Sequence, residues 1–316
     1  MQRVLILGGS GFVGRALCER LVQDYGSGGP RLVVPTRRRS HAQAVQLLPL
    51  VDVVEANVHD DAALDQLLAG CDAVVNLVAI LHGSEAAFEA THVQLPQRLA
   101  AACVRQGVRR LVHVSALGVS ADAPSRYLRS KARGEAVLKA APLDLTLLRP
   151  SVIFGAQDRF LNLFAQLQAL APVVPLAGAS ARFQPVWVDD VAEAIAHCLA
   201  NPATAGQTYE CAGPDVLTLA DLVRLAGRLS GHERPIVPLP GPLAQVQAMM
   251  MELAPGEPLM SRDNLASMTV PNVATGLLPG LAALGITPAA LAAIGPSYLA
   301  PHQACARLDA WRALHR

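Results

Sequence analysis

A tyrosine and a lysine four residues apart are the side chains of this sequence best suited to proton transfer. They are Tyr127 and Lys131, in a chain that has lysine at only one other position, Lys139. Residues four apart share one face of a helix, and a neighbouring ammonium group lowers the pKa of a phenol from its usual value of about 10. The pair therefore predicts an acid/base tyrosine tuned by a lysine. An ordinary surface pair is the alternative interpretation.

A serine lies twelve residues before the tyrosine. Ser115 ends a short apolar stretch, residues 109–115, that has the character of a buried strand. From such a strand end, the hydroxyl can donate a hydrogen bond to a substrate carbonyl. We therefore predict Ser115, Tyr127 and Lys131 as a catalytic set.

Four glycines follow the first apolar stretch of the chain. They fit two spacings, GxGxxG through Gly9, Gly11 and Gly14, or GxxGxxG through Gly8, Gly11 and Gly14. In either spacing glycine permits a tight turn and the close approach of a pyrophosphate, and the next helix offers N–H groups and its positive dipole end. Because the loop joins a predicted strand to a predicted helix, it indicates a dinucleotide site in preference to an unliganded glycine turn.

The end of the second predicted strand bears on which dinucleotide binds. It reads Thr36, Arg37, Arg38 and Arg39, without the acid that commonly bonds the ribose 2′-hydroxyl of NAD. Arg37 or Arg38 can bond a 2′-phosphate through two N–H groups at once. We therefore predict NADP(H) in preference to NAD(H). A solvated basic turn is the alternative.

The elements that must position these side chains alternate between strand and helix. Short, nearly continuous apolar stretches are typical of strands buried on both faces of a parallel sheet, and they lie at residues 3–8, 31–36, 52–56, 73–79, 109–115 and 144–149. Helical patterns lie at 12–24, 61–69, 86–106 and 125–140, and Pro96 should kink or divide the third. The alternation predicts an α/β fold, a Rossmann-type doubly wound parallel sheet that binds ligands beyond the carboxyl ends of its strands.

The rhythm changes after about residue 150, where proline and glycine become denser. We predict an NADP(H)-binding Rossmann domain over residues 1–204, of which 150–185 contribute partly to the substrate cleft. Residues 205–316 are predicted to form a smaller C-terminal lobe for substrate or docking. Residues 186–200 are expected to return to the first domain, and Thr218 with Asp221 forms a predicted capping box at the start of a helix.

Composition excludes several classes of protein. The 316 residues carry a net charge of +1, so no nucleic-acid partner is predicted. The six cysteines show no CxxC spacing, which predicts no metal site and fits a reducing, cytoplasmic compartment. The N-terminus lacks the apolar run of a signal peptide, and residues 160–181, the best candidate for a membrane span, contain two prolines and two glutamines.

One long segment lacks charge altogether. Residues 264–306 contain no Asp, Glu, Lys or Arg and are interrupted by prolines and glycines. Packing against the body of the protein is one interpretation. The other is a surface that faces a membrane or a partner.

Taken together, the motifs resemble those of the short-chain dehydrogenase/reductase superfamily, in its extended or atypical branch, which is NAD-dependent epimerase/dehydratase-like. The resemblance rests on the glycine loop, residues 76–79, Ser115, the Tyr127/Lys131 pair and residues 149–150. Residues 112–116, 125–131, 154–162, 184–190 and 285–288 are also similar to the NADPH-binding accessory subunit family of respiratory complex I. The resemblance therefore covers nearly the whole chain.

The resemblance implies a role for each stretch of the cofactor site. Residues that would wrap the pyrophosphate are Gly8, Ser10, Gly11, Phe12 and Val13, while Thr36, Arg37 and Arg38 would surround the 2′-phosphate. The adenine would lie near Asn57 and Val58, and the adenine ribose and diphosphate near Leu77, Val78 and Ala79. The nicotinamide end would lie near Val114, Ser115, Tyr127, Lys131, Pro150, Val152 and Ile153. Asparagine at 57 departs from the acid that the superfamily usually has there.

Two functions fit these observations. The first is an NADPH-dependent oxidoreductase that acts on a hydrophobic carbonyl or quinone-like substrate through Ser115, Tyr127 and Lys131. The second is a non-catalytic accessory or assembly protein of a membrane respiratory complex, in which the resemblance implies a structural cofactor. The second would place a cytoplasmic protein peripherally at the inner face of a membrane, docked through the uncharged C-terminal segment. Fold and cofactor alone do not choose between them.

Overall fold

The computed structural model describes residues 1–253 and 259–300. The chain forms two compact units, each built from several stretches. Unit 1 contains Met1–Pro150, Val188–Cys211 and Thr275–Thr287. Unit 2 contains Ser151–Trp187 and the described residues of 212–274 and from Pro288 onward. Unit 1 thus takes in two stretches that follow residue 204, where the sequence analysis placed a boundary. As a border between independently folding domains, that boundary stays a prediction.

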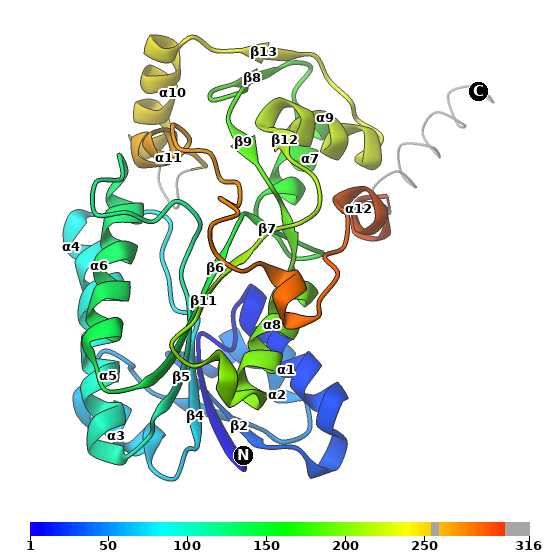
Figure 1. Cartoon of the computed structure of the whole chain (residues 1–316). Coiled ribbons are helices and arrows are strands. Elements are labelled where there is room, and N and C mark those ends of the chain that lie inside the picture. The colour runs from blue at the N-terminus through cyan, green and yellow to red at the C-terminus, as the bar shows by residue number, and fades with distance from the viewer. Residues whose placement is uncertain (254–258, 301–316) are drawn as a thin grey trace. The chain divides into compact units, whose positions relative to one another are not determined.

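Unit 1 is built on a seven-stranded, wholly parallel sheet (Figure 1). In the order of the chain the strands are β1 (Arg3–Leu7), β2 (Arg31–Thr36), β3 (Val51–Glu55), β4 (Ala73–Asn76), β5 (Arg110–Val114), β6 (Asp144–Pro150) and β11 (Thr208–Cys211). They lie side by side as β11-β6-β5-β4-β1-β2-β3. All six predicted strands are present, and the seventh, β11, adds an edge that no long apolar run had indicated.

Helices cover both faces of this sheet, so the predicted doubly wound fold is confirmed (Figure 1). The helices α1 (Phe12–Tyr25) and α8 (Val188–Ala200) pack together on one face, and α3 (Asp61–Leu68), α5 (Leu95–Gln106) and α6 (Arg126–Ala140) pack in sequence on the other. Short elements complete the unit: the 3-10 turns Gly26–Gly28, Arg39–Ala42, Pro202–Thr204 and Leu281–Leu284, with helix α2 (Gln43–Gln46).

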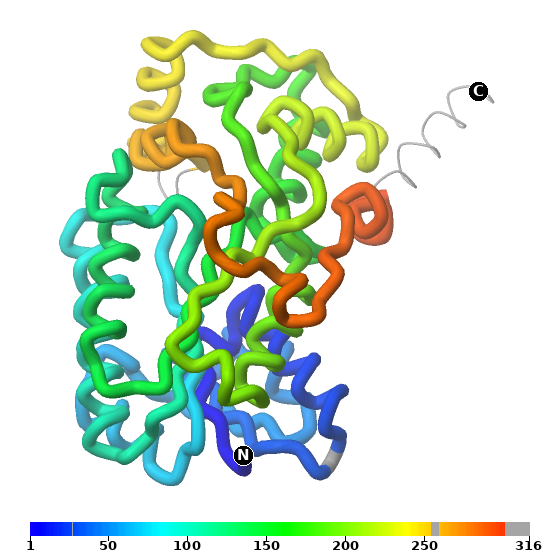
Figure 2. Tube along the Cα trace, in the orientation of Figure 1, coloured from blue at the N-terminus to red at the C-terminus, as the bar shows by residue number. Residues whose placement is uncertain are grey.

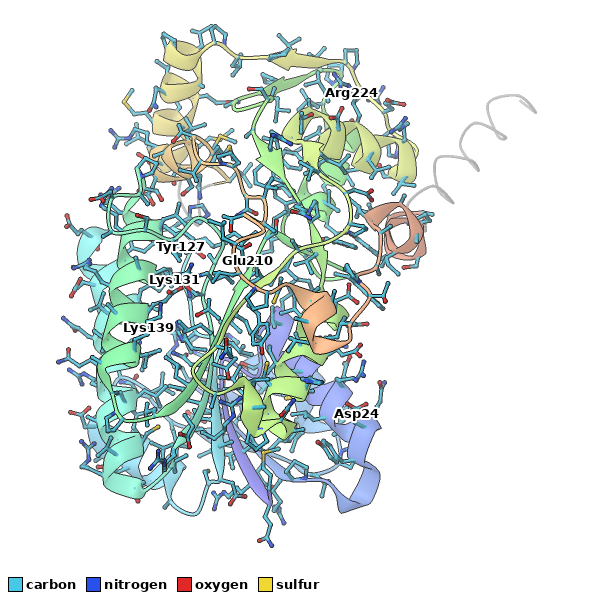
Figure 3. The ribbon with its side chains drawn as sticks, viewed as in Figure 1. Asp24, Tyr127, Lys131, Lys139, Glu210 and Arg224 are labelled. Atoms are coloured by element: carbon cyan, nitrogen blue, oxygen red, sulfur yellow. The ribbon has the colours of Figure 1, made fainter. Side chains whose placement is uncertain are left out.

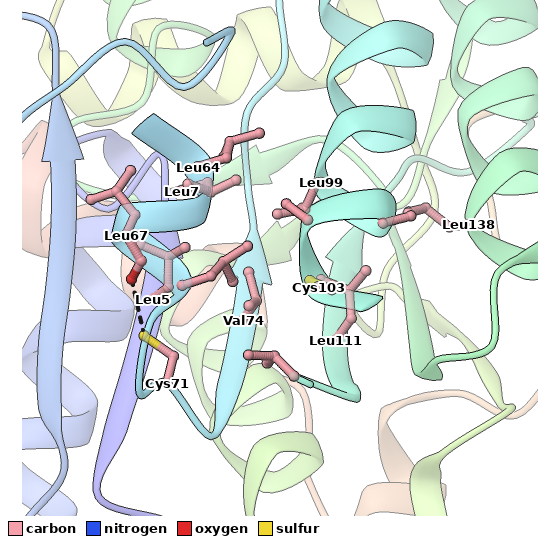
Figure 4. Close-up of a cluster of buried hydrophobic side chains, with 14 of the residues drawn as sticks. Leu5, Leu7, Leu64, Leu67, Cys71, Val74, Leu99, Cys103, Leu111 and Leu138 are labelled. Carbon is pink, nitrogen blue, oxygen red and sulfur yellow. Dashed lines mark hydrogen bonds between the residues drawn. The ribbon is translucent and has the colours of Figure 1, made fainter. Parts of the chain in front are cut away.

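One core cluster of unit 1 lies between the sheet and the α3–α5 layer (Figure 4). Leucine, valine and cysteine side chains fill it, among them Leu5, Leu7, Leu64, Leu67, Val74, Leu99, Cys103 and Leu111. The Cys71 thiol donates a hydrogen bond to the Leu67 carbonyl oxygen at 3.2 Å. Because both faces of β1 and β4 are buried, their residues are apolar and do not alternate, apart from Arg3 at the start of β1 and Asn76 at the end of β4.

The third predicted helix is divided, as Pro96 predicts. It consists of α4 (Glu85–Glu89), a π-helical turn over Ala90–Gln94, and α5, with Pro96 in the first turn of α5. Proline has no N–H to donate to the carbonyl four residues earlier, which here belongs to His92. Gly134 of α6 fits against that carbonyl, because a Cβ added at Gly134 would stand 2.0 Å from the His92 oxygen. Figure 2 shows the two chain segments side by side.

In its described residues, unit 2 has three two-stranded sheets and several helices. The pairs are β7 (Ile153–Phe154) with β10 (Val186–Trp187), β9 (Arg182–Phe183) with β12 (Leu217–Thr218), and β8 (Val174–Leu176) with β13 (Ile236–Pro238). Helices are α7 (Leu161–Leu170), α9 (Leu219–Ser230), α10 (Gly241–Leu253), α11 (Arg262–Ser267) and α12 (Leu291–Leu299). The predicted capping box of α9 is confirmed, because the Asp221 N–H donates to the Thr218 hydroxyl at 3.1 Å and the Thr218 N–H to the Asp221 carboxylate at 3.3 Å.

The uncharged segment contributes side chains to both units. Of residues 264–306, those up to 300 are described, while 301–306 lie outside the described residues. Leu281, Leu284 and Ile286 are buried in unit 1, and Leu291 and Leu299 are buried in unit 2. Much of the segment therefore has a packing role. Over the described parts of the chain, no helix combines the length and the apolar character needed to cross a membrane.

Candidate functional site

The glycine loop turns sharply at the carboxyl end of β1. Gly8 has a φ of 81°, in the left-handed region that favours glycine. The Gly11 N–H donates to the Gly8 carbonyl at 3.0 Å, and a Cβ added at Gly14 would stand 2.3 Å from that same oxygen. The loop and the first turn of α1 are therefore packed as closely as backbone allows, which only glycine permits at position 14.

The start of α1 is open to an anion. Gly11 is the N-cap and has no side chain to cap the helix, and no acidic residue stands in the first turn. The amide groups and the positive dipole end are therefore available to a diphosphate. The backbone of the glycine loop and the first turn of α1 therefore suits the diphosphate of a dinucleotide. This stretch includes the predicted residues Ser10, Phe12 and Val13.

The loop after β4 comes against the glycine loop. A Cβ added at Gly8 would stand 3.2 Å from the Cβ of Leu77 and 3.4 Å from the Val78 nitrogen. Buried Asn76 holds this loop, because its Oδ1 accepts from the Val78 N–H at 3.1 Å while its Nδ2 donates to His113 Nδ1 at 3.1 Å. The structure thus brings two of the predicted stretches together, Gly8–Val13 and Leu77–Ala79.

The arginines after β2 are exposed and make no ion pair with a described residue. The Thr36 hydroxyl donates to the Arg38 carbonyl oxygen at 3.0 Å and so shapes this turn. The pKa of His59, in the loop after β3, is held below its usual range by burial and then by the charges of Arg98 and Arg37. Arg37 therefore lies near this loop. The unpaired guanidinium groups of Arg37 and Arg38 are free to meet a phosphate.

Asn57 and Val58 follow β3. The Asn57 side-chain oxygen accepts from the His59 N–H at 3.2 Å, which leaves the amide nitrogen as a donor. Val58 is partly buried against the core of unit 1. Asn57 is therefore exposed and able to hydrogen-bond, whereas Val58 has a packing role.

The Tyr127/Lys131 pair lies on one face of α6 (Figure 3). Ser125 caps this helix by accepting from the Leu128 N–H at 3.2 Å. Lys131 is 2% exposed, and its Nζ donates to the Val114 carbonyl oxygen at 2.9 Å, which fixes the ammonium at the carboxyl end of β5. Burial lowers the pKa of Lys131 to about 8, although the charge of Glu135 opposes the shift.

The pKa of Tyr127 shifts in the direction opposite to the prediction. Burial raises it to about 12, whereas the sequence analysis expected the lysine to lower it. Burial is the cause of the shift, because a phenolate is costly to take out of water. Tyr127 is therefore a protonated phenol at neutral pH, which suits it to donate a proton and not to accept one.

A histidine that sequence reasoning missed stands beside Tyr127. The His92 ring lies edge-on to the Tyr127 ring with centroids 5.5 Å apart. Its Nε2 accepts from the Ile80 N–H at 3.1 Å, so Nδ1 carries the proton and donates to the Ser130 hydroxyl at 2.8 Å. Ser130 donates in turn to the Tyr127 carbonyl oxygen at 2.8 Å. Burial, and then Lys131, lowers the pKa of His92 to about 3, so the ring is neutral.

This network connects the loop after β4 to the turn of α6 that carries the tyrosine. No local pattern marks it in the sequence, because His92 lies inside a predicted helix with neither a metal-ligand spacing nor a catalytic motif around it. The only signal was Pro96, which implied an irregular turn at this place. Among residues 1–253 and 259–300, no group of three or more His, Cys, Asp or Glu side chains is placed to hold a metal ion.

Ser115 lies at the predicted strand end, but its hydroxyl is turned into the protein. The Oγ is buried, and no described group bonds it with good geometry. The Glu135 carboxylate is a polar neighbour of this hydroxyl. Burial acts to raise the pKa of Glu135, but Arg149, the Ser115 hydroxyl and Lys139 together lower it below its usual value. Arg149 donates two hydrogen bonds to Glu135, at 2.9 and 2.5 Å. The Ser115 hydroxyl is thus buried beside the Glu135 carboxylate.

The last predicted stretch is divided between the units. Pro150 ends β6 in unit 1, and its carbonyl oxygen accepts from the Leu117 N–H at 3.0 Å. Val152 and Ile153 belong to unit 2, where the Val152 N–H donates to Asn272 Oδ1 at 2.8 Å and Ile153 pairs with Val186. The roles of Pro150, Val152 and Ile153 beside the nicotinamide stay predictions.

Comparison with known sequences agrees with this geometry. A sequence profile of the NAD dependent epimerase/dehydratase family matches residues 4–212, which include the whole glycine loop, the Tyr127/Lys131 pair and β11. The chain belongs to the NAD dependent epimerase/dehydratase family. The predicted resemblance is thereby confirmed, and with it the Rossmann-type, NAD(P)-binding fold.

The named relatives of this chain carry names of different kinds. NADH dehydrogenase [ubiquinone] 1 alpha subcomplex subunit 9, mitochondrial, of Rattus norvegicus is 30% identical over 293 residues, which cover 90% of this chain and 76% of that protein. Ceramide reductase of Caulobacter vibrioides is 28% identical over 240 residues, covering 76% and 74%. The structure of DesIV, a dTDP-glucose 4,6-dehydratase of Streptomyces venezuelae with NAD and TYD bound, aligns with a TM-score of 0.67 at 27% identity over 75% of this chain and 84% of that one.

Proposed function

We propose that this epimerase/dehydratase-family protein binds NADP(H) and reduces a hydrophobic carbonyl or quinone-like substrate. The observation that carries the proposal is the buried Lys131, fixed to the Val114 carbonyl one helical turn from Tyr127. A lysine whose pKa falls to about 8 is costly to bury, because the burial penalises its charge. Such a residue is a candidate for function in preference to packing.

The chain's own residues would act as binder and proton donor. The backbone of residues 8–14 would hold the diphosphate, and Lys131 would bond the nicotinamide ribose while its charge favours developing negative charge nearby. When bound, the nicotinamide supplies or accepts hydride. Tyr127 Oη would donate its proton to the carbonyl oxygen of the substrate, for which a phenol protonated at neutral pH is suited.

The choice of NADP(H) rests on the turn after β2. Arg37 and Arg38 are exposed and no described acid neutralises them, and a 2′-phosphate offers the bidentate partner that a guanidinium prefers. The hydrophobic substrate rests on the apolar composition of the chain and on one relative whose name is ceramide reductase. NAD(H) stays the alternative, as in the DesIV structure.

A second function is favoured by the state of Ser115. With its hydroxyl buried beside Glu135, the predicted catalytic set lacks the group that polarises a carbonyl. The protein would then be an accessory or assembly factor of a membrane respiratory complex, as the name of the relative at 30% identity implies. The cofactor would act structurally, since a ligand that binds only the native state stabilises it. The chain would attach peripherally at the membrane through the uncharged segment 264–306.

The test is to purify the protein, release its nucleotide for identification, and add a panel of apolar carbonyls and quinones. The reductase proposal expects bound NADPH, which a panel member oxidises, and loss of that turnover in Tyr127→Phe with nucleotide still bound. Tyr25→Phe, an exposed tyrosine at the end of α1, is the matched control. Retained turnover in Tyr127→Phe contradicts the role of the tyrosine. Bound NADPH that no panel member oxidises favours the accessory function, and bound NAD contradicts the role given to Arg37 and Arg38.

A further inference from the structure

The loop after β4 is held at two points by buried histidines. We call residues 77–80 the β4 loop. At its start, the Asn76 side chain connects it to His113, which is 3% exposed. At its end, the Ile80 N–H donates to Nε2 of His92, which is 2% exposed, at 3.1 Å. Burying a polar side chain is costly unless its hydrogen bonds are made, so two imidazoles buried at one loop indicate that the placement of this loop matters.

The residues between these two points face the glycine loop. A Cβ added at Gly8 would stand 3.2 Å from the Leu77 Cβ and 3.4 Å from the Val78 nitrogen. Backbone segments packed this closely move together, so a diphosphate that settles on the glycine loop also restricts the β4 loop. Ile80 follows Val78 by two residues, and the direction of its N–H is therefore set by the same placement.

His92 connects this loop to the turn that bears the tyrosine. Its Nδ1 donates to the Ser130 hydroxyl at 2.8 Å, and Ser130 donates to the Tyr127 carbonyl oxygen at 2.8 Å. Because the bond from Ile80 leaves the proton on Nδ1, each donor and each acceptor in this chain of bonds is fixed. Burial, and then the charge of Lys131, lowers the pKa of His92 to about 3, so the neutral ring keeps this form across the neutral pH range.

The ring of His92 also packs directly against the tyrosine. Its centroid lies 5.5 Å from that of Tyr127, with the ring planes at 78°. Phe88 completes the group, with its centroid 5.6 Å from that of His92 and 6.4 Å from that of Tyr127. Edge-on contacts of aromatic rings are directional, so a displaced imidazole also displaces the phenol. An apolar side chain could fill the same space, but only a polar one connects it to two separate segments.

The place of Tyr127 in its helix makes this connection consequential. Tyr127 lies in the first turn of α6, whose N–H groups have no partner within the helix, whereas Lys131 is one turn further on and is bonded to β5. We propose that His92 is a positioning residue that transmits the placement of the β4 loop to Tyr127 through Ser130, so that a filled nucleotide site sets the tyrosine. The inference rests on the proposed nucleotide site and does not depend on turnover.

Fluorine NMR of the full chain, with fluorotyrosine at its four tyrosines, tests the connection. The probe is ADP, which carries the diphosphate but lacks the nicotinamide and its ribose, the parts predicted to lie beside Tyr127. Calorimetry measures the binding of ADP, and Tyr127→Phe identifies the signal. We expect ADP to move the Tyr127 signal in the wild type. Ser130→Ala should bind ADP within about 3-fold of the wild type but lose more than half of that movement.

Ser230→Ala is the matched control. Ser230 is likewise buried in a helix and donates to the carbonyl oxygen three residues earlier, but it belongs to unit 2. Its loss should leave the movement of the Tyr127 signal unchanged. A signal that ADP does not move in the wild type, or moves equally in Ser130→Ala, overturns the proposal. Failure of ADP to bind the wild type overturns the nucleotide site and the inference with it, so calorimetry distinguishes the two failures.

Replacing the histidine separates its two hydrogen bonds. His92→Leu removes both, and the β4 loop without its anchor should bind ADP about 5–10-fold more weakly. His92→Gln offers an amide oxygen about as far from the backbone as Nε2, so it can accept from the Ile80 N–H and should bring ADP binding back to within about 3-fold of the wild type. Without the Nδ1 donor, the Tyr127 signal should still not move. ADP binding as tight in His92→Leu as in the wild type contradicts the anchoring role.

Discussion

Replacing Gly134 by alanine tests the close contact that supports the Tyr127 turn. Gly134 lies on α6 against the carbonyl that Pro96 leaves without its usual helical partner. An alanine Cβ would stand 2.0 Å from the His92 oxygen and 3.2 Å from the His92 carbonyl carbon. Both contacts are to backbone, so no flexible side chain can move aside.

Two opposing effects determine how much stability the Gly134→Ala protein loses. Alanine in place of glycine inside a helix stabilises it by about 0.5–1 kcal/mol. Relieving the contact requires the two helical segments to separate by at least about 1 Å, and overpacking of this kind costs about 1–3 kcal/mol or more. Since the obstacle is backbone, we expect the upper part of that range and a net loss of about 2 kcal/mol. For a chain of 316 residues the melting temperature should fall by about 3 °C.

Thermal and urea unfolding of Gly134→Ala beside the wild type measures this loss. Gly241→Ala is the matched control, because no atom lies within 4 Å of its added Cβ, and its effect should stay within about 0.5 kcal/mol. The shift should also displace His92, so nucleotide should raise the melting temperature of Gly134→Ala less than that of the wild type. A Gly134→Ala protein as stable as the wild type, or more stable, would refute the reasoning.

Three further predictions concern the candidate site. Arg37→Gln should weaken NADP(H) binding about 10–100-fold and leave NAD(H) binding unchanged, as calorimetry would measure, with Arg39→Gln as the control. Ser115→Ala should alter carbonyl reduction by less than about 3-fold, since its hydroxyl is buried away from solvent, whereas a 100-fold loss would restore the serine as a substrate contact. Because the pKa of Lys131 falls to about 8 on folding from a usual value of 10.5, the unfolded chain binds more protons between those pH values, and this lysine makes stability rise with pH across that window. The wild type should gain about 3 kcal/mol relative to Lys131→Met between pH 7.5 and 10.5 in urea unfolding, and a difference that does not change with pH would contradict the buried ammonium.

The regular part of unit 1 was predictable because its signals are local. Continuous apolar runs such as residues 3–8 mark strands buried on both faces, and glycines at fixed offsets mark the turn into α1. Pro96 marked the divided helix for an equally local reason, the missing N–H. β11 escaped prediction because only four residues form it and two of them, Thr208 and Glu210, are polar. Its edge position is held by Glu210, which accepts from the Thr275 N–H at 2.7 Å, a contact between residues 65 apart (Figure 3 labels Glu210).

The side chains of the candidate site show where local reasoning stops. Their identities and spacing predicted that Tyr127 and Lys131 share a helical face, since the helical period places residues four apart together. Their protonation could not be read from spacing, because the depth of burial sets the direction of each pKa shift, and that depth depends on segments far away in the chain. The same holds for Ser115, whose hydroxyl direction depends on how β5 and α6 meet.

Composition, hydrophobic period and turn chemistry were thus sufficient for the Rossmann-type sheet, the nucleotide loop and the Tyr127/Lys131 pair, because each is encoded within a few neighbouring residues. Packing between distant segments alone established the His92–Ser130 network and the buried Ser115 hydroxyl. The physical reason is the same in both cases. Burial and hydrogen-bond partners are properties of tertiary contacts, and a residue's type constrains them only after the fold has chosen its neighbours.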